Sequence, residues 1–206
     1  MSEPVAVAIL AKAPLAGFAK TRLAAQLGAE RAALLAARLI ERAVETASRS
    51  GVGPVTLWAA PDAAHPLFQA VRARHGTRLE RQSEGDLGAR MYAAMAAAKG
   101  PALVIGTDCP ALTSNDLRRA AETVRLNTDA VIFPAEDGGY GLIGLRAPQR
   151  AVFEAMSWGT SRVLGETRRR FKELGLTWQE PVTLGDLDLS TDIDRLADIG
   201  LQTLIP

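Results

Sequence analysis

An acidic residue directly follows an apolar run near the middle of the chain. Asp108 lies in the segment 106–110 (Gly-Thr-Asp-Cys-Pro), after the run 101–105, whose β-branched centre is typical of a strand buried on both faces. Pro110 forbids simple continuation of that strand. Because ligands of open α/β sheets bind outside the carboxyl ends of the strands, this carboxylate is well placed to hold a metal. The segment alone leaves a second interpretation open, in which Asp108 only caps a helix beginning near residue 114.

A second group of chemically capable residues forms a cationic loop after the first apolar run. Residues 12–23 (Lys-Ala-Pro-Leu-Ala-Gly-Phe-Ala-Lys-Thr-Arg-Leu) hold Lys12, Lys20 and Arg22 around Gly17. Backbone N–H groups of a glycine loop, together with Lys and Arg side chains, can neutralise a polyphosphate and stabilise charge that develops on it. The spacing is neither a Walker A loop nor a dinucleotide-binding glycine motif. A solvated basic loop is the alternative.

The elements that must position these groups alternate between strand and helix. Apolar runs and helical periodicity predict the order βαβαβαβα. The strands are expected over 5–10, 55–59, 78–82 and 101–105, and the helices over 29–48, 66–75, 86–99 and 114–126. Such alternation favours right-handed crossovers, a mainly parallel sheet and helices on both of its faces.

The alternation stops in the last third of the chain. Strand candidates 130–134 and 140–145 are separated by too few residues for a crossover helix, so they either pair as a hairpin or bend away from the main sheet. Helices over 149–156 and 161–174, a strand over 178–184 and a short helix over 191–200 follow. We find no linker or repeat, so we expect residues 1–206 to form a single domain.

Composition excludes several classes of partner. The 206 residues can bury roughly 70% of the surface of the unfolded chain, and the formal charge of +1 with no basic block argues against nucleic acid. The single Cys109 excludes an intrachain disulfide, and we see neither a signal peptide nor a membrane span, which predicts a cytoplasmic protein. Cys109 is expected to pack as a small side chain, and His65 and His75 to be surface or capping residues.

Six short blocks in this order resemble a known family. They are 11–23, 82–91 (Gln-Ser-Glu-Gly-Asp-Leu-Gly-Ala-Arg-Met), 106–110, 137–145, 158–164 and 186–196. The chain resembles a bacterial glycosyltransferase-like family of unknown function in the nucleotide-diphospho-sugar transferase superfamily, and its Lys-Thr-Arg-Leu loop is similar to that of 2-phospholactate guanylyltransferases. The resemblance implies the glycosyltransferase-A fold, a three-layer α/β/α arrangement around a Rossmann-like sheet.

The resemblance also implies a metal site. Asp108 matches the superfamily's metal-binding aspartate, and Asp188 matches its second acidic ligand. Two carboxylates with phosphate oxygens suit Mg2+, or Mn2+ in its place. Leu189 stands where relatives usually have Thr, and a change of register by one step would move the second ligand to Asp186 or Asp192.

Further matches imply nucleotide and acceptor contacts. Asp86 and Arg90 resemble the nucleotide-proximal helix start, with simple helix capping as the alternative for Asp86. The glycines of the 137–140 segment let backbone approach a ligand closely, although a tight turn explains them equally well. Thr160 and Ser161 lie in a motif usually written Trp-Ser-Thr, from which Gly159 departs, and they either bind an acceptor anion or cap the next helix. The implied acceptor-binding residues are Gly138, Gly139, Tyr140, Thr160 and Ser161.

The function implied by these matches is metal-dependent transfer from a nucleotide donor to a small-molecule acceptor. In the favoured version, Lys20 and Asp108 are catalytic and a nucleoside triphosphate donates its nucleotidyl group to a phosphorylated or acidic acceptor, since a triphosphate needs more cationic compensation than a sugar diphosphate. A glycosyltransferase that uses a nucleotide sugar is the alternative. A nucleotide-binding protein without turnover is the third possibility. The sequence does not indicate the oligomeric state.

Overall fold

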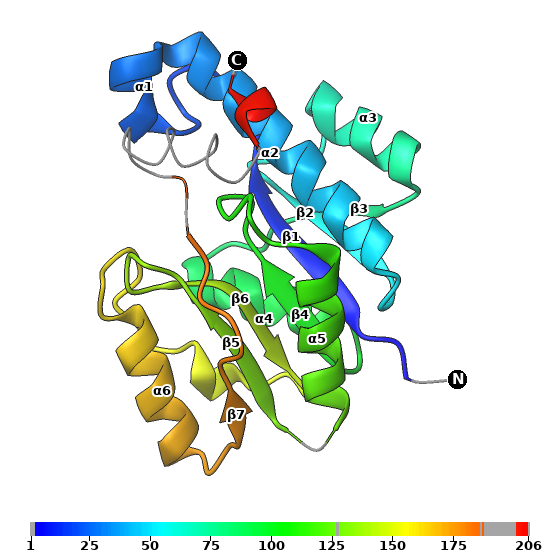
Figure 1. Cartoon of the computed structure of the whole chain (residues 1–206), viewed down its shortest axis with the longest axis vertical. Helices are drawn as coiled ribbons and strands as arrows, with labels where there is room; N and C mark the ends of the chain where they lie inside the picture. The colour runs from blue at the N-terminus through cyan, green and yellow to red at the C-terminus, as the bar shows by residue number, and fades with distance from the viewer. Residues whose placement is uncertain (1–2, 127, 186, 188–200, 206) are drawn as a thin grey trace.

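Strands and helices alternate along most of the chain, as the sequence predicts. Figure 1 shows a computed structural model, which describes residues 3–126, 128–185, 187 and 201–205. The strands are β1 (Ala6–Lys12), β2 (Val55–Ala60), β3 (Arg78–Arg81), β4 (Ala102–Ile105), β5 (Ala130–Pro134), β6 (Tyr140–Leu145) and β7 (Trp178–Gln179). The helices are α1 (Thr21–Leu27), α2 (Ala29–Ser50), α3 (Pro66–His75), α4 (Leu87–Ala97), α5 (Ser114–Arg125) and α6 (Val163–Glu173), with 3-10 turns η1 (Arg150–Val152) and η2 (Gln202–Leu204).

The strands of the described chain form one mixed sheet in the order β3-β2-β1-β4-β6-β5-β7. All neighbouring pairs are parallel except those made by β6, which runs antiparallel to both β4 and β5. The hairpin alternative for β5 and β6 is therefore confirmed. The expectation of a mainly parallel Rossmann-like sheet is confirmed as well.

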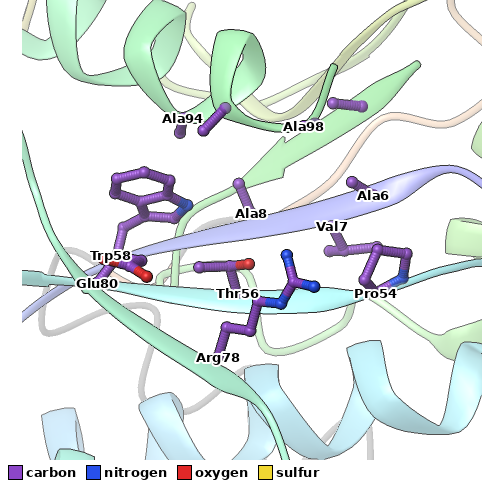
Figure 2. A pocket seen from close by; sticks show the side chains of 12 residues that line it. Ala6, Val7, Ala8, Pro54, Thr56, Trp58, Arg78, Glu80, Ala94 and Ala98 are labelled. Atoms are coloured by element: carbon purple, nitrogen blue, oxygen red, sulfur yellow. The ribbon is translucent and has the colours of Figure 1, made fainter. Parts of the chain in front are cut away.

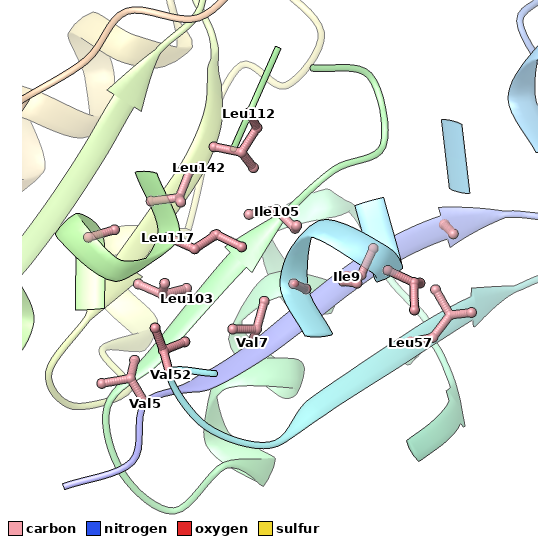
Figure 3. Close-up of a cluster of buried hydrophobic side chains, with 14 of the residues drawn as sticks. Val5, Val7, Ile9, Val52, Leu57, Leu103, Ile105, Leu112, Leu117 and Leu142 are labelled. Atoms are coloured by element: carbon pink, nitrogen blue, oxygen red, sulfur yellow. The ribbon is translucent and has the colours of Figure 1, made fainter. Parts of the chain in front are cut away.

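Helices cover both faces of the sheet, which gives the three expected layers. One core cluster joins α2, α3 and α5 to the strands, and Figure 3 shows part of it, including Val7 of β1 and Ile105 of β4 near Leu117 of α5. The other cluster joins α4, α6 and η1 to the opposite face, which receives Ala8 of β1. The alternation of side chains along β1 thus serves both layers. Each fully buried Leu or Ile contributes about 1.5–3 kcal/mol, so both faces are firmly held.

Two helices lie next to the cationic loop. Helix α2 begins one residue after Gly28 and ends before Gly51, whose left-handed conformation stops it, two residues beyond the predicted end. Helix α1 was not predicted, because no side chain caps it and its N-cap is Lys20. Leu23 of α1 is buried against Leu35 of α2, so tertiary packing explains the existence of this short helix.

The predicted helix over 149–156 is wrong. Only the 3-10 turn η1 forms, and the chain then turns sharply at Ala155, whose φ is 50°. Val152 and Phe153 are buried there, so packing replaces helical hydrogen bonding as the local determinant. The last strand is shorter than predicted because Pro181 follows Gln179 closely and offers no N–H to the ladder. The predicted helix over 191–200 lies outside the described residues.

The sequence shows no membrane-spanning segment, and the helices of the structure can be compared with that expectation. Within the described ranges, no helix has both the length and the apolar character required to cross a bilayer.

Candidate active site

Strands β1 and β4 end side by side at one edge of the sheet. They are parallel neighbours, with Ile9 opposite Ile105, so the loops that follow them leave at the same edge. From β1 the chain continues to β2 on one side, while β4 lies on the other side. Such a switch of direction opens the crevice in which doubly wound α/β proteins bind ligands.

An ion pair joins these two loops. Lys20 Nζ lies 2.6 Å from Asp108 Oδ1, and the lysine side chain is only 7% exposed whereas the aspartate side chain is 53% exposed. The same ammonium donates a hydrogen bond to the carbonyl oxygen of Leu187, and the Leu187 N–H donates to the Asp108 carbonyl at 2.8 Å. The two predicted catalytic residues are therefore in direct contact, and a segment near the carboxyl end of the chain is bonded to both.

Asp108 does not cap the helix that follows it. Thr113 is the N-cap of α5, and Thr113 and Asp116 bond reciprocally in a capping box. The helix-capping alternative for Asp108 is therefore wrong, and its half-exposed carboxylate contacts Lys20 instead.

The oxygens around Lys20 Nζ are of the kind that a divalent cation requires. A carboxylate oxygen and a backbone carbonyl oxygen already bind a cation there, the lysine ammonium. Mg2+ is commonly held by one or two carboxylates together with substrate phosphates, so these residues fit a metal that arrives with a ligand. Among the described residues there is no group of three or more His, Cys, Asp or Glu that could hold a metal. The predicted second ligand, Asp188, and the alternatives Asp186 and Asp192 lie outside the described residues.

The loop that carries Asp108 is held from two sides. Arg42 of α2 donates from Nε to the Pro110 carbonyl at 2.6 Å, and burial lowers the pKa of this guanidinium. On the other side, a Cβ placed on Gly141 of β6 would lie 2.4 Å from Cys109 Sγ. Cys109 is half-buried against that glycine, which agrees with its expected packing role. The loop geometry thus depends on neighbours far away in sequence.

A buried glutamine, which was not among the predicted site residues, joins the candidate Arg90 to strands β1 and β2. Gln82 follows β3, and its amide nitrogen donates to the Ala11 carbonyl at 3.0 Å and the Trp58 carbonyl at 2.9 Å. Its oxygen accepts from Arg90 at 3.4 Å, and Arg90 Nε also donates to the Gly85 carbonyl. Gln82 therefore fixes Arg90 beside the end of β1. A polar residue directly after a strand was the available signal.

The remaining nucleotide-binding candidates occupy the same edge. Lys12 is the exposed last residue of β1, and Gly17 is exposed with a φ of 80°. Arg22 lies exposed in the first turn of α1. Asp86 is the N-cap of α4 and accepts from the Ala89 N–H at 2.8 Å, so its capping alternative is confirmed.

The two acceptor-side segments contact each other. The Gly138 carbonyl accepts from the Leu164 N–H at 2.9 Å, and a Cβ on Gly138 would lie 2.4 Å from the Ser161 carbonyl oxygen. The side chains of Thr160 and Ser161 are exposed, and α6 begins at Val163 without a side-chain cap. The Thr160 hydroxyl nevertheless accepts from the N–H of Arg162, the N-cap residue of α6, at 3.3 Å. The capping alternative therefore holds in part for Thr160, which bonds the turn that leads into the helix and not its first turn. The structure brings together segments that are separated by some 20 positions in the sequence.

Tyr140 and Gly139 complete the acceptor-side turn. The Gly139 N–H donates to the Asp137 carboxylate at 2.8 Å, which fixes the turn between β5 and β6. The Tyr140 hydroxyl is buried and burial raises its pKa, while the ring packs against the cluster under α4 and α6. The hydroxyl therefore does not reach the surface of the site, so any contact of Tyr140 with an acceptor involves the half-buried ring or the backbone.

A separate cavity of about 300 Å3 lies away from this edge. Figure 2 shows it between α4 and the strands β1 to β3, with Trp58, Thr56 and Arg78 on one wall and Ala94 of α4 opposite. None of the predicted site residues that the structure describes lines this cavity. The edge at which β1 and β4 end, where Lys20 and Asp108 form their ion pair, is therefore the better candidate for the active site.

Solved structures share this architecture. A protein from Desulfovibrio desulfuricans G20, provisionally described as a nucleotide-diphospho-sugar transferase, is 27% identical with a TM-score of 0.82, over 92% of this chain and 84% of that one. CMP:2-keto-3-deoxy-manno-octonic acid synthetase, complexed with CTP, is 12% identical with a TM-score of 0.64, over 98% of this chain and 100% of that one. Glucosyl-3-phosphoglycerate synthase from Mycobacterium tuberculosis, in complex with Mn2+, UDP and glucosyl-3-phosphoglycerate, is 12% identical with a TM-score of 0.57, over 98% of this chain and 78% of that one.

These likenesses confirm the nucleotide-diphospho-sugar transferase fold. Among curated proteins, none matches the sequence. The family described as "Uncharacterized protein conserved in bacteria (DUF2064)" matches residues 43–160, which include β4 with Asp108 and the turn at Gly138. The chain therefore belongs to the DUF2064 family.

Proposed function

We propose that this protein is a transferase that uses a nucleoside triphosphate and passes its nucleotidyl group to a small phosphorylated or acidic acceptor. The observation that carries the proposal is the contact between Lys20 and Asp108 at the crevice between β1 and β4. Lys20 can bind a phosphate and Asp108 can bind a metal, and the two side chains are in contact at the edge where α/β sheets bind ligands.

Positive charge on the loop after β1 supports a triphosphate donor. Lys12, Lys20 and Arg22 lie on that loop and on the helix that follows it, and Gln82 holds Arg90 beside the end of β1. Together they can offset the charge of the phosphates and of the departing pyrophosphate. Lys20 has its ammonium at the crevice already, so in our proposal it contacts the phosphate nearest to the reacting bond.

Asp108 is the proposed holder of Mg2+ or Mn2+. A metal bound there would polarise a phosphoryl oxygen and offset negative charge. Its other ligands would come from the donor phosphates, in the manner usual for Mg2+. Asp188 remains the proposed second carboxylate on sequence grounds alone.

The acceptor is proposed to lie against the turn at Gly138 and the exposed Thr160 and Ser161. Gly141, which follows this turn closely, is in contact with Cys109, the neighbour of Asp108, so the two halves of the site are adjacent. The protein would then act by holding donor and acceptor in a reactive geometry. An acceptor oxygen attacks the α-phosphorus of the nucleoside triphosphate, pyrophosphate leaves, and no covalent bond to the enzyme forms.

Glycosyl transfer is the second candidate. It is favoured by the description of the Desulfovibrio protein, which has the same fold at 27% identity, as a nucleotide-diphospho-sugar transferase. In that reaction a nucleoside diphosphate leaves in place of pyrophosphate, and the same cations would receive it.

One assay separates the candidates. The protein is incubated with Mg2+, panels of nucleoside triphosphates or nucleotide sugars, and small phosphorylated or carboxylic acids. Release of pyrophosphate supports nucleotidyl transfer, and release of nucleoside diphosphate from a nucleotide sugar supports glycosyl transfer. Nucleotide binding without either product would reject both and leave a binding protein. An Asp108→Asn variant serves as the control for contaminating activity.

A further inference from the structure

The Lys20 ammonium occupies a small cation site made of oxygens. Its partners are the Asp108 carboxylate at 2.6 Å and the Leu187 carbonyl, and its side chain is 7% exposed. This is the arrangement of a bound cation, with the cation supplied by the chain itself. Lys12 and Arg22, the other cations of the loop, are exposed. The Lys20 ammonium, by contrast, lies against the oxygens of the site.

A divalent metal and this ammonium cannot share the site. A metal on Asp108 would lie within a few ångströms of Lys20 Nζ, and like charges at such separations repel strongly in a partly buried environment. The ammonium must therefore leave Asp108 and Leu187 before a metal is held there. Its departure from Asp108 is costly in the absence of another anion, because a mostly buried ammonium would give up a charged partner.

Movement of the ammonium requires only side-chain rotation. The Lys20 carbonyl accepts from the N–H groups of Leu23 and Ala24, each at 3.0 Å, so α1 fixes its backbone in the left-handed conformation. The four-carbon stem can still swing the ammonium away from Asp108. A phosphate entering the crevice would give the ammonium a new partner at the moment when the carboxylate becomes available.

We infer that Lys20 is a built-in competitor of the metal: it keeps a free divalent cation off Asp108 until nucleotide phosphates draw it away. The inference rests on the proposed function and adds a binding order to it, in which metal is held only together with phosphate. Metal and nucleotide therefore bind with positive coupling, each favouring the other by the same factor.

The test measures binding of Mn2+ alone by electron paramagnetic resonance and titration calorimetry. The full chain is compared with Lys20→Met, Lys20→Gln, Lys20→Arg and the matched control Lys12→Met, which removes an equal charge from the same loop. We expect Mn2+ to bind Lys20→Met and Lys20→Gln at least about tenfold more tightly than the parent, because the competing ammonium is gone. Lys20→Arg and Lys12→Met should stay within about twofold of the parent, since the first keeps the cation and the second leaves Lys20 in place.

Equal Mn2+ affinity in the parent and in a folded Lys20→Met or Lys20→Gln variant overturns the inference. A gain of the same size in Lys12→Met overturns it too, since the effect would then be one of net charge. Circular dichroism and thermal melting confirm that each variant is folded, and the two neutral variants stand in for each other if one is not. Because no nucleotide is present, these outcomes are independent of the proposed function, which fails separately if the parent neither binds nor turns over any nucleotide with Mn2+.

Discussion

Gly138 is the position at which a single methyl group should most disturb the proposed acceptor site. Its φ is 87°, and an added Cβ would lie 2.4 Å from the Ser161 carbonyl oxygen and 2.7 Å from Ser161 Cα. These are backbone atoms, so the methyl cannot be accommodated by a change of rotamer. Gly138→Ala therefore forces the turn and the loop at Ser161 apart.

Gly159 provides a matched control in the neighbouring loop. Its φ is 77°, but a Cβ there would have nothing within 4 Å. Gly159→Ala should cost only the left-handed conformation, about 1–2 kcal/mol. Gly138→Ala should cost that amount plus a steric term of about 1–3 kcal/mol. For a chain of this size, about 1 kcal/mol lowers Tm by about 2–4 °C.

The assay is thermal and urea unfolding of the parent and both variants, followed by measurement of KM for an acceptor once one is known. We expect Gly138→Ala to lower Tm by about twice as much as Gly159→Ala, or more, and to raise the acceptor KM. Equal losses of Tm in the two variants would refute the reasoning, because the close approach to Ser161 would then carry no energy.

Three further predictions concern the crevice and the distal edge of the sheet. Asp108→Asn should reduce metal-dependent turnover by about 100-fold or more while the far-ultraviolet spectrum stays that of the parent; retained turnover would reject its role. Gln82→Leu should cost about 2–4 kcal/mol in urea unfolding, because two strand carbonyls lose their donor, and it should weaken nucleotide binding by releasing Arg90. Hydrogen bonds from Arg168 hold the pKa of Glu180 below its usual range, so this stabilisation is present above the ordinary carboxyl pKa and is lost as pH falls through the lowered value. Glu180→Gln should therefore lower Tm relative to the parent near neutral pH, with a difference that disappears in acid; a constant difference would contradict the assignment.

The fold was largely predictable because its signals are local. Apolar runs mark β1, β2 and β4, of which the last two end at proline and glycine, and the five residues between β5 and β6 are too few for a helix. The prediction of a helix over 149–156 was wrong because the residue types of this segment favour a helix, whereas burial of Val152 and Phe153 imposes a turn. Helix α1 has no capping side chain, so the sequence carries no signal for the start of this helix. In both cases long-range packing decided the structure.

The residues of the candidate site were predictable from their types and positions, but the contacts between them were not. Sequence placed Lys20 in the loop after the first strand and Asp108 just after the central strand, but their contact depends on the order of the strands in the sheet. The Leu187 carbonyl that accepts from the Lys20 ammonium is a backbone group, for which no side-chain pattern exists. The role of Gln82 likewise depends on carbonyl oxygens of two neighbouring strands.

The reversed direction of β6 has a consequence for how proteins with this architecture can diverge. Because β6 runs against β4 and β5, the turn 135–139 opens at the same edge as the loops after β1 and β4. A surface turn between hairpin strands tolerates insertions and exchanges at little cost to the sheet. The part of the proposed acceptor site that this turn contributes can therefore change in sequence and length while β1 and β4, and the loops that follow them, stay the same.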